Sequence, residues 1–355
     1  SPDEMDLKVK VKDKDTGKIG GGIGYSTYDG VYFAGSLEES NMFGKGWAAS
    51  LMGQWSDRRT SYTFTATNPR WDDSKLGVGL TLYDRKDDLT DYQRDSLGGK
   101  IVFSYPLGEY TSLLWDYNVE RYTIYDIIKG AAQEIQDASG TSVASVASVS
   151  LVRDTTDGSN QKMSTKGTVN TLTLSYGGGL IMGDDNFIRA IYDNNWYQTL
   201  LGDLVFHWHG QAGWVGQNLG GEKIPLGQRF YLGGSGSVRG YTQRKISPLD
   251  DNDVIGGDKE AFVNLELIHP LSKRAGVYGS VFFDAGGTWN EGEMWLSNPS
   301  RGGIAGPPGG LYKSVGVGLL WFSPMGPLKL EFGHGLDNLY DSAHNRVEFN
   351  MGRTF

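Results

Sequence analysis

The sequence predicts an all-β protein, a 16-stranded antiparallel transmembrane β-barrel with a long loop folded into the lumen. Three features favour this class: the composition, a two-residue hydrophobic repeat, and connections that alternate between short and long. Glycine accounts for 52 of 355 residues and aromatic residues for 12%, both high for a soluble α/β enzyme. No run approaches the ~20 apolar residues that a membrane helix needs. Barrel strands instead carry apolar residues at alternate positions.

The hydrophobic repeat extends from about residue 19 to the end of the chain. In the segment KLGVGLTLY (75–83), for example, Leu76, Val78 and Leu80 share one face and small residues the other. Half-buried strands of a soluble sandwich would show the same alternation. The number of strands is more informative, because single-chain bacterial barrels have an even number. We expect sixteen, at 19–27, 30–39, 46–56, 60–68, 75–85, 93–105, 110–123, 143–153, 167–177, 186–198, 201–213, 260–269, 274–285, 311–322, 326–334 and 345–355.

The connections between these strands alternate in length. Short turns occur at 41–45, 106–109 and 323–325, whereas long loops occur at 124–142, 214–259 and 286–310. Short turns at one rim and long loops at the other are typical of membrane barrels. The connection 154–166 is an exception, because it is long on the short-turn side. Residues 126–138 have a helical pattern with Ile127, Ile128, Ala131 and Ile135 on one face, so we expect a small loop helix on the rim.

The first residues differ from the rest of the chain. In MDLKVKVKDKDTG (5–17) charged residues occupy alternate positions, and a turn follows. We expect residues 1–17 to be the end of a truncated soluble domain and residues 18–355 to form the barrel. A disordered tag is the alternative. No signal peptide is visible, so the sequence is treated as a fragment or a mature form.

Several motifs together point to a known family. The loop 214–259 contains GGSGSVRGY (233–241), and FFDAG (282–286) ends a later strand. The penultimate hairpin contains SPMGPL, and the chain ends in VEFNMGRTF. NMFGKG (41–46) and TNP (67–69) fit as well. This set resembles the outer-membrane insertase superfamily, and within it the BamA family, the barrel subunits of the outer-membrane protein assembly machine. The resemblance implies that residues 1–17 end a periplasmic POTRA domain, with the N-terminus in the periplasm.

The VRGY motif contributes the first group of candidate site residues: Val238, Arg239, Gly240 and Tyr241. Strand alternation places Glu266 and Asp284 on the lumenal faces of adjacent strands. A guanidinium can bridge two carboxylates with directed hydrogen bonds. We therefore hypothesise that the loop folds into the lumen and that Glu266 and Asp284 hold Arg239, a contact that the resemblance also implies. The alternative is an ordinary lumenal carboxylate pair and a solvated arginine.

The seam between the first and last strands contributes the second group. Glycine fills four of the eight positions in KIGGGIGY (18–25), and glycine weakens a strand. A weak seam could open sideways and expose edges that template an incoming strand; the resemblance implies such a lateral gate. Relief of crowding in a narrow lumen is the alternative reason for the glycines. The expected gate residues are Gly20, Gly21, Gly22, Ile23, Gly24, Val347, Phe349, Met351, Gly352 and Phe355. Ile23 and Phe349 are the expected neighbours across the seam.

Nothing in the sequence favours catalysis. GxSxG, P-loop and HExxH motifs are absent, and we expect neither an enzyme nor a cofactor. His207 and His209 share one lumenal face, but two imidazoles make a weak metal site, and no metal is expected. The net charge of −9 argues against a nucleic-acid partner. Cysteine is absent.

The expected function follows from the resemblance. The leading hypothesis is an insertase that assists folding and insertion of nascent β-barrel proteins into the outer membrane of a Gram-negative-type bacterium. Its implied partners are those nascent proteins, assembly lipoproteins and outer-membrane lipid. The alternative is a polypeptide-transport pore of the same superfamily, similar to TamA or to a two-partner secretion transporter. An enzyme, in the barrel or in a lost N-terminal domain, is the third hypothesis.

Overall fold

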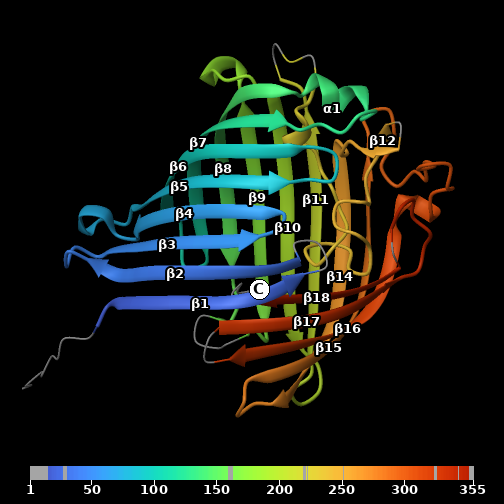
Figure 1. The fold of residues 1–355 in the computed structure, drawn as a ribbon. Helices are drawn as coiled ribbons and strands as arrows, with labels where there is room; N and C mark the ends of the chain where they lie inside the picture. The colour runs from blue at the N-terminus through green and yellow to red at the C-terminus, as the bar shows by residue number, and fades with distance from the viewer. Residues whose placement is uncertain are drawn as a thin grey trace, which may run out of the picture.

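The computed structural model describes residues 15–26, 30–158, 163–218, 221, 223–250, 252–323, 326–342 and 344–351. Sixteen antiparallel strands form a closed barrel (Figure 1), which confirms the predicted fold class. The barrel strands are β1 (Gly17–Ser26), β2 (Gly30–Met42), β3 (Trp47–Ser56), β4 (Arg59–Asn68), β5 (Gly77–Asp88), β6 (Gln93–Pro106), β7 (Thr111–Tyr125), β8 (Gly140–Asp154), β9 (Gly167–Gly177), β10 (Phe187–Thr199), β11 (Val205–Gly216), β14 (Lys259–Ser272), β15 (Val277–Trp289), β16 (Tyr312–Ser323), β17 (Gly326–Gly335) and β18 (Asn345–Met351).

The strands pair with their neighbours in chain order, and β1 closes the ring against β18. One expected strand, 201–213, is placed too early, since β11 begins at Val205. Leu200 and Leu204 close a tight turn there, with the Leu200 amide donating to the Leu204 carbonyl at 2.8 Å. A small hairpin that the hydrophobic alternation did not predict lies between β11 and β14. Its two strands, of two residues each, are β12 (Leu249–Asp250) and β13 (Asp253–Val254).

The two faces of the wall have opposite polarity. On β16, Val315 and Val317 are 39% and 53% exposed, whereas Ser314, on the other face of the same strand, is fully buried. The outward face of the barrel is therefore apolar, as a lipid-facing wall requires. Exposed tryptophans such as Trp55, Trp196 and Trp321 contribute to it. Trp289 is different, because it is fully buried and its Nε1 donates to the Ser297 carbonyl at 3.0 Å.

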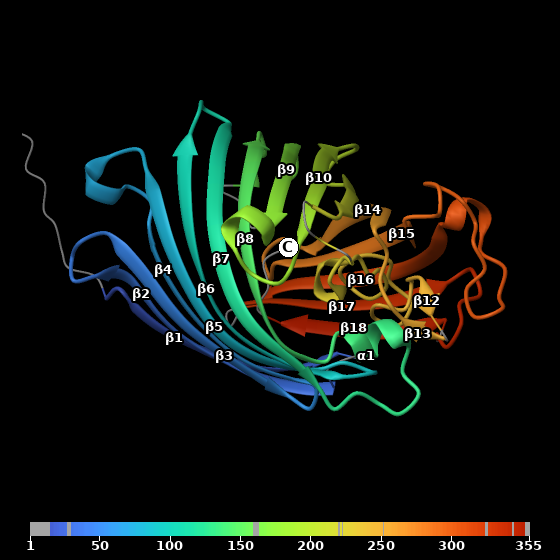
Figure 2. The same ribbon diagram turned by 90° about the horizontal axis from the view of Figure 1, so that it is seen from above.

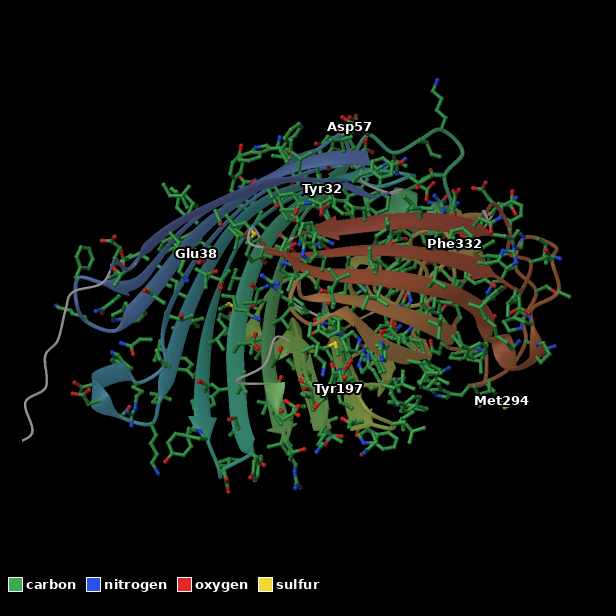
Figure 3. The ribbon with its side chains drawn as sticks, turned by 90° about the horizontal axis from the view of Figure 1, so that it is seen from below. Tyr32, Glu38, Asp57, Tyr197, Met294 and Phe332 are labelled. Carbon is green, nitrogen blue, oxygen red and sulfur yellow. The ribbon has the colours of Figure 1, made fainter. Side chains whose placement is uncertain are left out.

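Most of the long connections lie at one rim of the barrel. Figure 3 labels two residues of this rim, Asp57 in the β3–β4 turn and Met294 in the loop between β15 and β16. The predicted helix 126–138 is much shorter, since only α1 (Gln133–Asp137) is helical. Gly130, at φ +85°, interrupts the pattern. Ile135 is fully buried, but Ile128 is 48% exposed, so the predicted apolar face was wrong at that position.

Four single-turn 3-10 helices complete the described elements. They are η1 (Trp71–Asp73), η3 (Gly179–Ile181), η4 (Leu226–Gln228) and η5 (Pro308–Gly310). In the part of the chain that the structure describes, no helix is long and apolar enough to cross a membrane.

Candidate functional site: the lumen loop and the seam

The segment 217–258, hereafter the lumen loop, connects β11 to β14. Figure 2 shows its yellow and orange trace within the ring of strands when the barrel is viewed from above. Part of the loop packs on the wall through a buried cluster in which Leu232, Val238 and Tyr241 meet Phe262 and Tyr312. Near α1, Leu226 and Ile255 of the loop join Ile135 in a second cluster. The lumen loop therefore contacts both the inner wall of the barrel and the helix α1 at the rim.

Arg239 is the most heavily bonded residue of the loop. Its Nε and Nη2 donate to the two carboxylate oxygens of Asp284 on β15 at 2.8 and 2.6 Å. Its Nη1 donates to Glu266 on β14, and the Arg239 backbone amide adds a 3.0 Å bond to Asp284. The structure thus brings together the three side chains that the sequence had paired. A forked, charge-assisted contact of this kind fixes both distance and orientation.

A third carboxylate completes the Arg239 site and was missing from the sequence-based set. Glu331 on β17 accepts from Nη1 of Arg239 at 2.7 Å and also pairs with Lys329 at 2.9 Å. Phe282 stacks beneath the guanidinium, 3.5 Å from its Cζ to the ring centroid. The alternation of Leu328, Leu330 and Phe332 with Lys329 and Glu331 does indicate a lumenal Glu331. That pattern alone, however, names no partner for it.

The neighbours of Arg239 explain the rest of the motif. Gly240 has φ +88°, and a Cβ there would lie 2.9 Å from the Gly335 amide nitrogen. Only glycine combines this left-handed conformation with so close an approach of two backbones. The Tyr241 hydroxyl donates to the Lys313 carbonyl at 2.7 Å and accepts from the Asp337 amide at 2.9 Å. Val238 is fully buried. The motif therefore docks as a unit against β14 to β17.

The two lumenal histidines also bear on this site. His209 lies 2.8 Å from Asp193 and 3.1 Å from Asn264, and Asn264 in turn donates to the Ser237 carbonyl in the lumen loop at 2.5 Å. His207 stacks on Tyr197, with ring centroids 4.4 Å apart. Both imidazoles therefore have polar or aromatic neighbours. Among the described residues, no three side chains that bind metals come together.

The seam between β1 and β18 closes the barrel. Among residues 15–26 and 344–351, the structure places Tyr25 opposite Phe349 in register. On its other side β1 pairs with β2 along its whole length, from Gly17 opposite Glu39 to Ser26 opposite Gly30. The expected neighbours Ile23 and Phe349 are thus two residues out of register. Sequence alternation fixes the face of each residue but not the stagger between two strands.

The remaining gate residues are placed as follows. Ile23 is 60% exposed and Val347 46% exposed on the outer face. Gly24 lies against the Tyr32 ring, where a Cβ would be 2.2 Å from it, whereas Gly21 has room for one. Gly20 and Gly22 lie opposite Ser36 and Ala34 of β2, and Met351 lies opposite Leu328 of β17. Gly352 and Phe355 lie outside the described residues, as do residues 1–14 of the predicted N-terminal domain remnant.

Comparison with known proteins places this architecture in a family. Residues 41–355 match the model of the Omp85 superfamily domain. The chain belongs to the Omp85 superfamily. The family prediction made from the motifs is therefore confirmed.

Individual relatives and a solved structure support the assignment to the Omp85 superfamily. The chain is 39% identical over 357 residues to the outer membrane protein assembly factor BamA of Nitratidesulfovibrio vulgaris, covering 99% of this chain and 44% of that protein. It is 26% identical to BamA of Neisseria meningitidis, covering 100% of this chain and 49% of that protein. The crystal structure of BamA from Haemophilus ducreyi lacking POTRA domains 1-3 matches 97% of this chain and 71% of that one, with a TM-score of 0.79 and 21% identity. The chain thus spans about half the length of the two sequence relatives.

Proposed function

We propose that this chain is the membrane barrel of an outer-membrane insertase, which assists the folding and insertion of nascent β-barrel proteins through a lateral gate between β1 and β18. Its relatives are outer membrane protein assembly factors, which supports this activity. The apolar outer face supports a position within the outer membrane.

One observation supports the gate most directly, the glycine content of β1. Glycine fills four of the eight positions from Lys18 to Tyr25, and glycine weakens a strand. Unpaired backbone N–H and C=O groups along a strand edge are a template for another strand. A client strand could add to that edge by β-augmentation, which needs main-chain hydrogen bonds rather than a particular client sequence.

The proposal also covers the surroundings of the barrel. We propose that residues 1–17 end a periplasmic POTRA domain and that the N-terminus faces the periplasm. Assembly lipoproteins are the proposed fixed partners and nascent barrels the transient ones. The work is mechanical, with no enzymatic step and no cofactor.

The lumen loop bears on the choice between an insertase and a polypeptide-transport pore. A pore needs an open lumen, whereas this loop is docked inside the barrel wall by Arg239 and its three carboxylates. Moving the loop aside would separate buried charges, which is costly. The insertase is therefore the preferred proposal.

A disulfide across the seam tests it. In the full-length protein, Tyr25→Cys with Phe349→Cys would lock β1 to β18 at their pair in register, and this chain contains no cysteine to interfere. We expect the oxidised lock to stop growth and outer-membrane protein assembly, and reduction to restore both. A matched control is the same pair of cysteines across β16 and β17, at Val317 and Phe332, which face each other in register. If a fully formed seam lock leaves assembly untouched, the gate is dispensable and the transport pore becomes the better proposal.

A further inference from the structure

We propose that the outer wall at β7 and β8 binds a phosphorylated glycolipid of the outer leaflet, with Arg121 holding a headgroup phosphate and the loop between β9 and β10 lying beside the acyl chains. This inference rests on the proposed function only for the position of the barrel in the outer membrane. β7 and β8 pair with each other and with β6 and β9, so neither strand borders the seam.

Arg121 lies where the apolar outer face of β7 ends. Tyr117 and Val119 are exposed on this face. Arg121 is the next exposed residue of the same face, whereas Glu120 is buried on the lumenal face. β7 begins at Thr111, ten residues before Arg121. At about 3.4 Å per residue and a tilt of about 40°, Arg121 is roughly 26 Å from that end of the strand along the barrel axis. An apolar band about 25 Å tall ends there, so Arg121 lies at the level of the lipid headgroups.

The guanidinium of Arg121 has apolar neighbours on both sides. In register with it lie Leu97 on β6 and Val143 on β8, and both side chains are exposed. None of the described residues forms an ion pair or a hydrogen bond with this guanidinium. A guanidinium is planar, weakly hydrated and able to donate to two phosphate oxygens at once. Arg121 is therefore placed to bind a phosphate above an apolar surface.

The carboxylates of this outer face do not neutralise Arg121. Asp95, further along β6, pairs with Lys86 at 3.3 Å. Asp84 lies on β5, with Leu97 between it and Arg121 in the same row. The positive charge of Arg121 is thus available to attract an anion from the membrane surface.

The second half of the site is the segment 178–186, hereafter the β9–β10 loop, which lies on the outer face of β8. The Asp184 amide donates to the Val143 carbonyl at 2.7 Å, and the Val143 amide donates to the Asp184 carboxylate at 2.7 Å. Ser145 Oγ donates to the Ile181 carbonyl at 3.1 Å. Ser145 belongs to the outer face and is nevertheless buried, because the loop covers it. The β9–β10 loop is therefore fixed to the wall at Val143, the neighbour of Arg121.

The tip of the β9–β10 loop presents two large apolar side chains. Leu180 is 85% exposed and Met182 is 79% exposed. Met182 has φ +62°, a left-handed conformation that is uncommon for a residue with a side chain. The tip lies at the height of Arg121, where apolar side chains enter the boundary between headgroups and acyl chains. A membrane would therefore bury the two side chains that the loop exposes.

These features together fit one class of ligand. A cation and an apolar tip lie on the two sides of Val143, which matches a phosphate with acyl chains below it. Long loops mark the outer side of a membrane barrel, so the lipid comes from the outer leaflet. In a Gram-negative outer membrane that leaflet consists of lipopolysaccharide, whose lipid A part carries phosphates and several acyl chains. A protein docked on the tip would need Leu180 and Met182 but not Arg121, so the unpaired cation favours the lipid.

Site-specific crosslinking tests the site. The full-length protein would carry a photoreactive benzophenone amino acid in place of Val119 and be reconstituted in phosphatidylcholine vesicles that contain diphosphorylated lipid A. We expect a lipid A adduct, and we expect Arg121→Gln to lower its yield about fivefold, the effect of one cation beside an anionic lipid surface. Arg121→Lys should keep most of the yield. Lipid A from which the phosphates have been removed should give a low yield with every variant.

Two matched controls use the other end of the wall. Arg153 is exposed on the outer face of β8 near the opposite border of the apolar band, and Arg153→Gln should leave the lipid A yield unchanged. Leu180→Ser with Met182→Ser should cause a partial loss. Leu201→Ser, at a residue that is 82% exposed in the turn between β10 and β11, should cause none. Every variant is first checked for the heat-resistant folded form.

Three results would overturn the inference. The first is an equal yield for Arg121→Gln and Arg153→Gln, and the second is an equal yield for lipid A with and without phosphates. The third is a benzophenone at Leu180 that crosslinks to a protein rather than to lipid in isolated outer membranes, which would make the tip a protein-docking surface. No client is present in the vesicles, so failure here leaves the proposed insertase standing, and the seam lock tests that proposal separately by growth and assembly.

Discussion

The seam between β1 and β18 differs from the wall of β14 and β15, which holds Arg239. Between β14 and β15 the ladder runs from Lys259 opposite Trp289 to Ser272 opposite Val277, with one irregularity. At the seam Tyr25 lies opposite Phe349, and glycine fills four of the eight positions from Lys18 to Tyr25. Glycine gives a strand little side-chain packing and weakens it. A closed ring can therefore contain one boundary that is weaker than the others.

The charges lie on the side of that wall. Glu266 and Asp284 belong to β14 and β15 and are 7% and 0% exposed, so Arg239 is anchored there. Glu331 connects that site to β17, next to the seam strand β18. The lumen loop is thus bonded to the wall strands and to the neighbour of the seam strand.

Removing Arg239 should have the largest effect, because it acts on both regions at once. Arg239→Ala removes the cation that the buried Glu266, Asp284 and Glu331 share, and loss of one partner of a buried pair costs about 3–5 kcal/mol. We expect the temperature at which the folded barrel converts to the unfolded form on a gel to fall markedly, together with lower assembly of the barrel itself. Arg239→Lys should recover only part of the loss, since an ammonium lacks the planar fork.

Arg244→Ala is the control for that variant. Arg244 lies in the same loop and stacks on Tyr231 at 3.7 Å from the ring centroid, away from the Arg239 carboxylates. Its loss should cost far less. Equal losses for the two variants would mean that the charge cluster has no special role.

Replacing Gly240 should have an intermediate effect, confined to the docking of the motif. Gly240→Ala places a methyl group 2.9 Å from the Gly335 amide nitrogen at φ +88°, and a strained backbone of this kind costs about 1–3 kcal/mol. We expect a lower unfolding temperature. Gly236→Ala, in the same loop with nothing within 4 Å of the added Cβ, should leave the unfolding temperature unchanged. A similar drop for both glycines would show only that the loop tolerates no alanine.

How far the sequence predicted these two regions also differs. Alternation gave all sixteen strands, because a strand with one apolar face shows its period directly. It placed Glu266 and Asp284 on the right face, but it did not identify Glu331 as a third partner, since the stagger between distant strands is not encoded locally. For the same reason Ile23 was paired with Phe349, where the structure has Tyr25. Gly130, at φ +85°, lies before the observed helix, which begins only at Gln133; the apolar pattern outweighed this local signal in the prediction.

The smallest expected effect is at the seam itself, where glycine has space to change. Gly21→Ala adds a methyl group whose nearest neighbour, the Ala34 carbonyl oxygen, is 3.6 Å away. Alanine is favoured over glycine in a strand by about 0.5–1 kcal/mol, so β1 should become slightly stiffer. We expect seam disulfide formation to rise and client assembly to slow, each by about twofold to fivefold. Gly24→Ala is the contrasting variant, because its methyl group would collide with Tyr32 at 2.2 Å and should disturb β1 instead. If Gly21→Ala left both rates unchanged, the flexibility of β1 would not limit the gate.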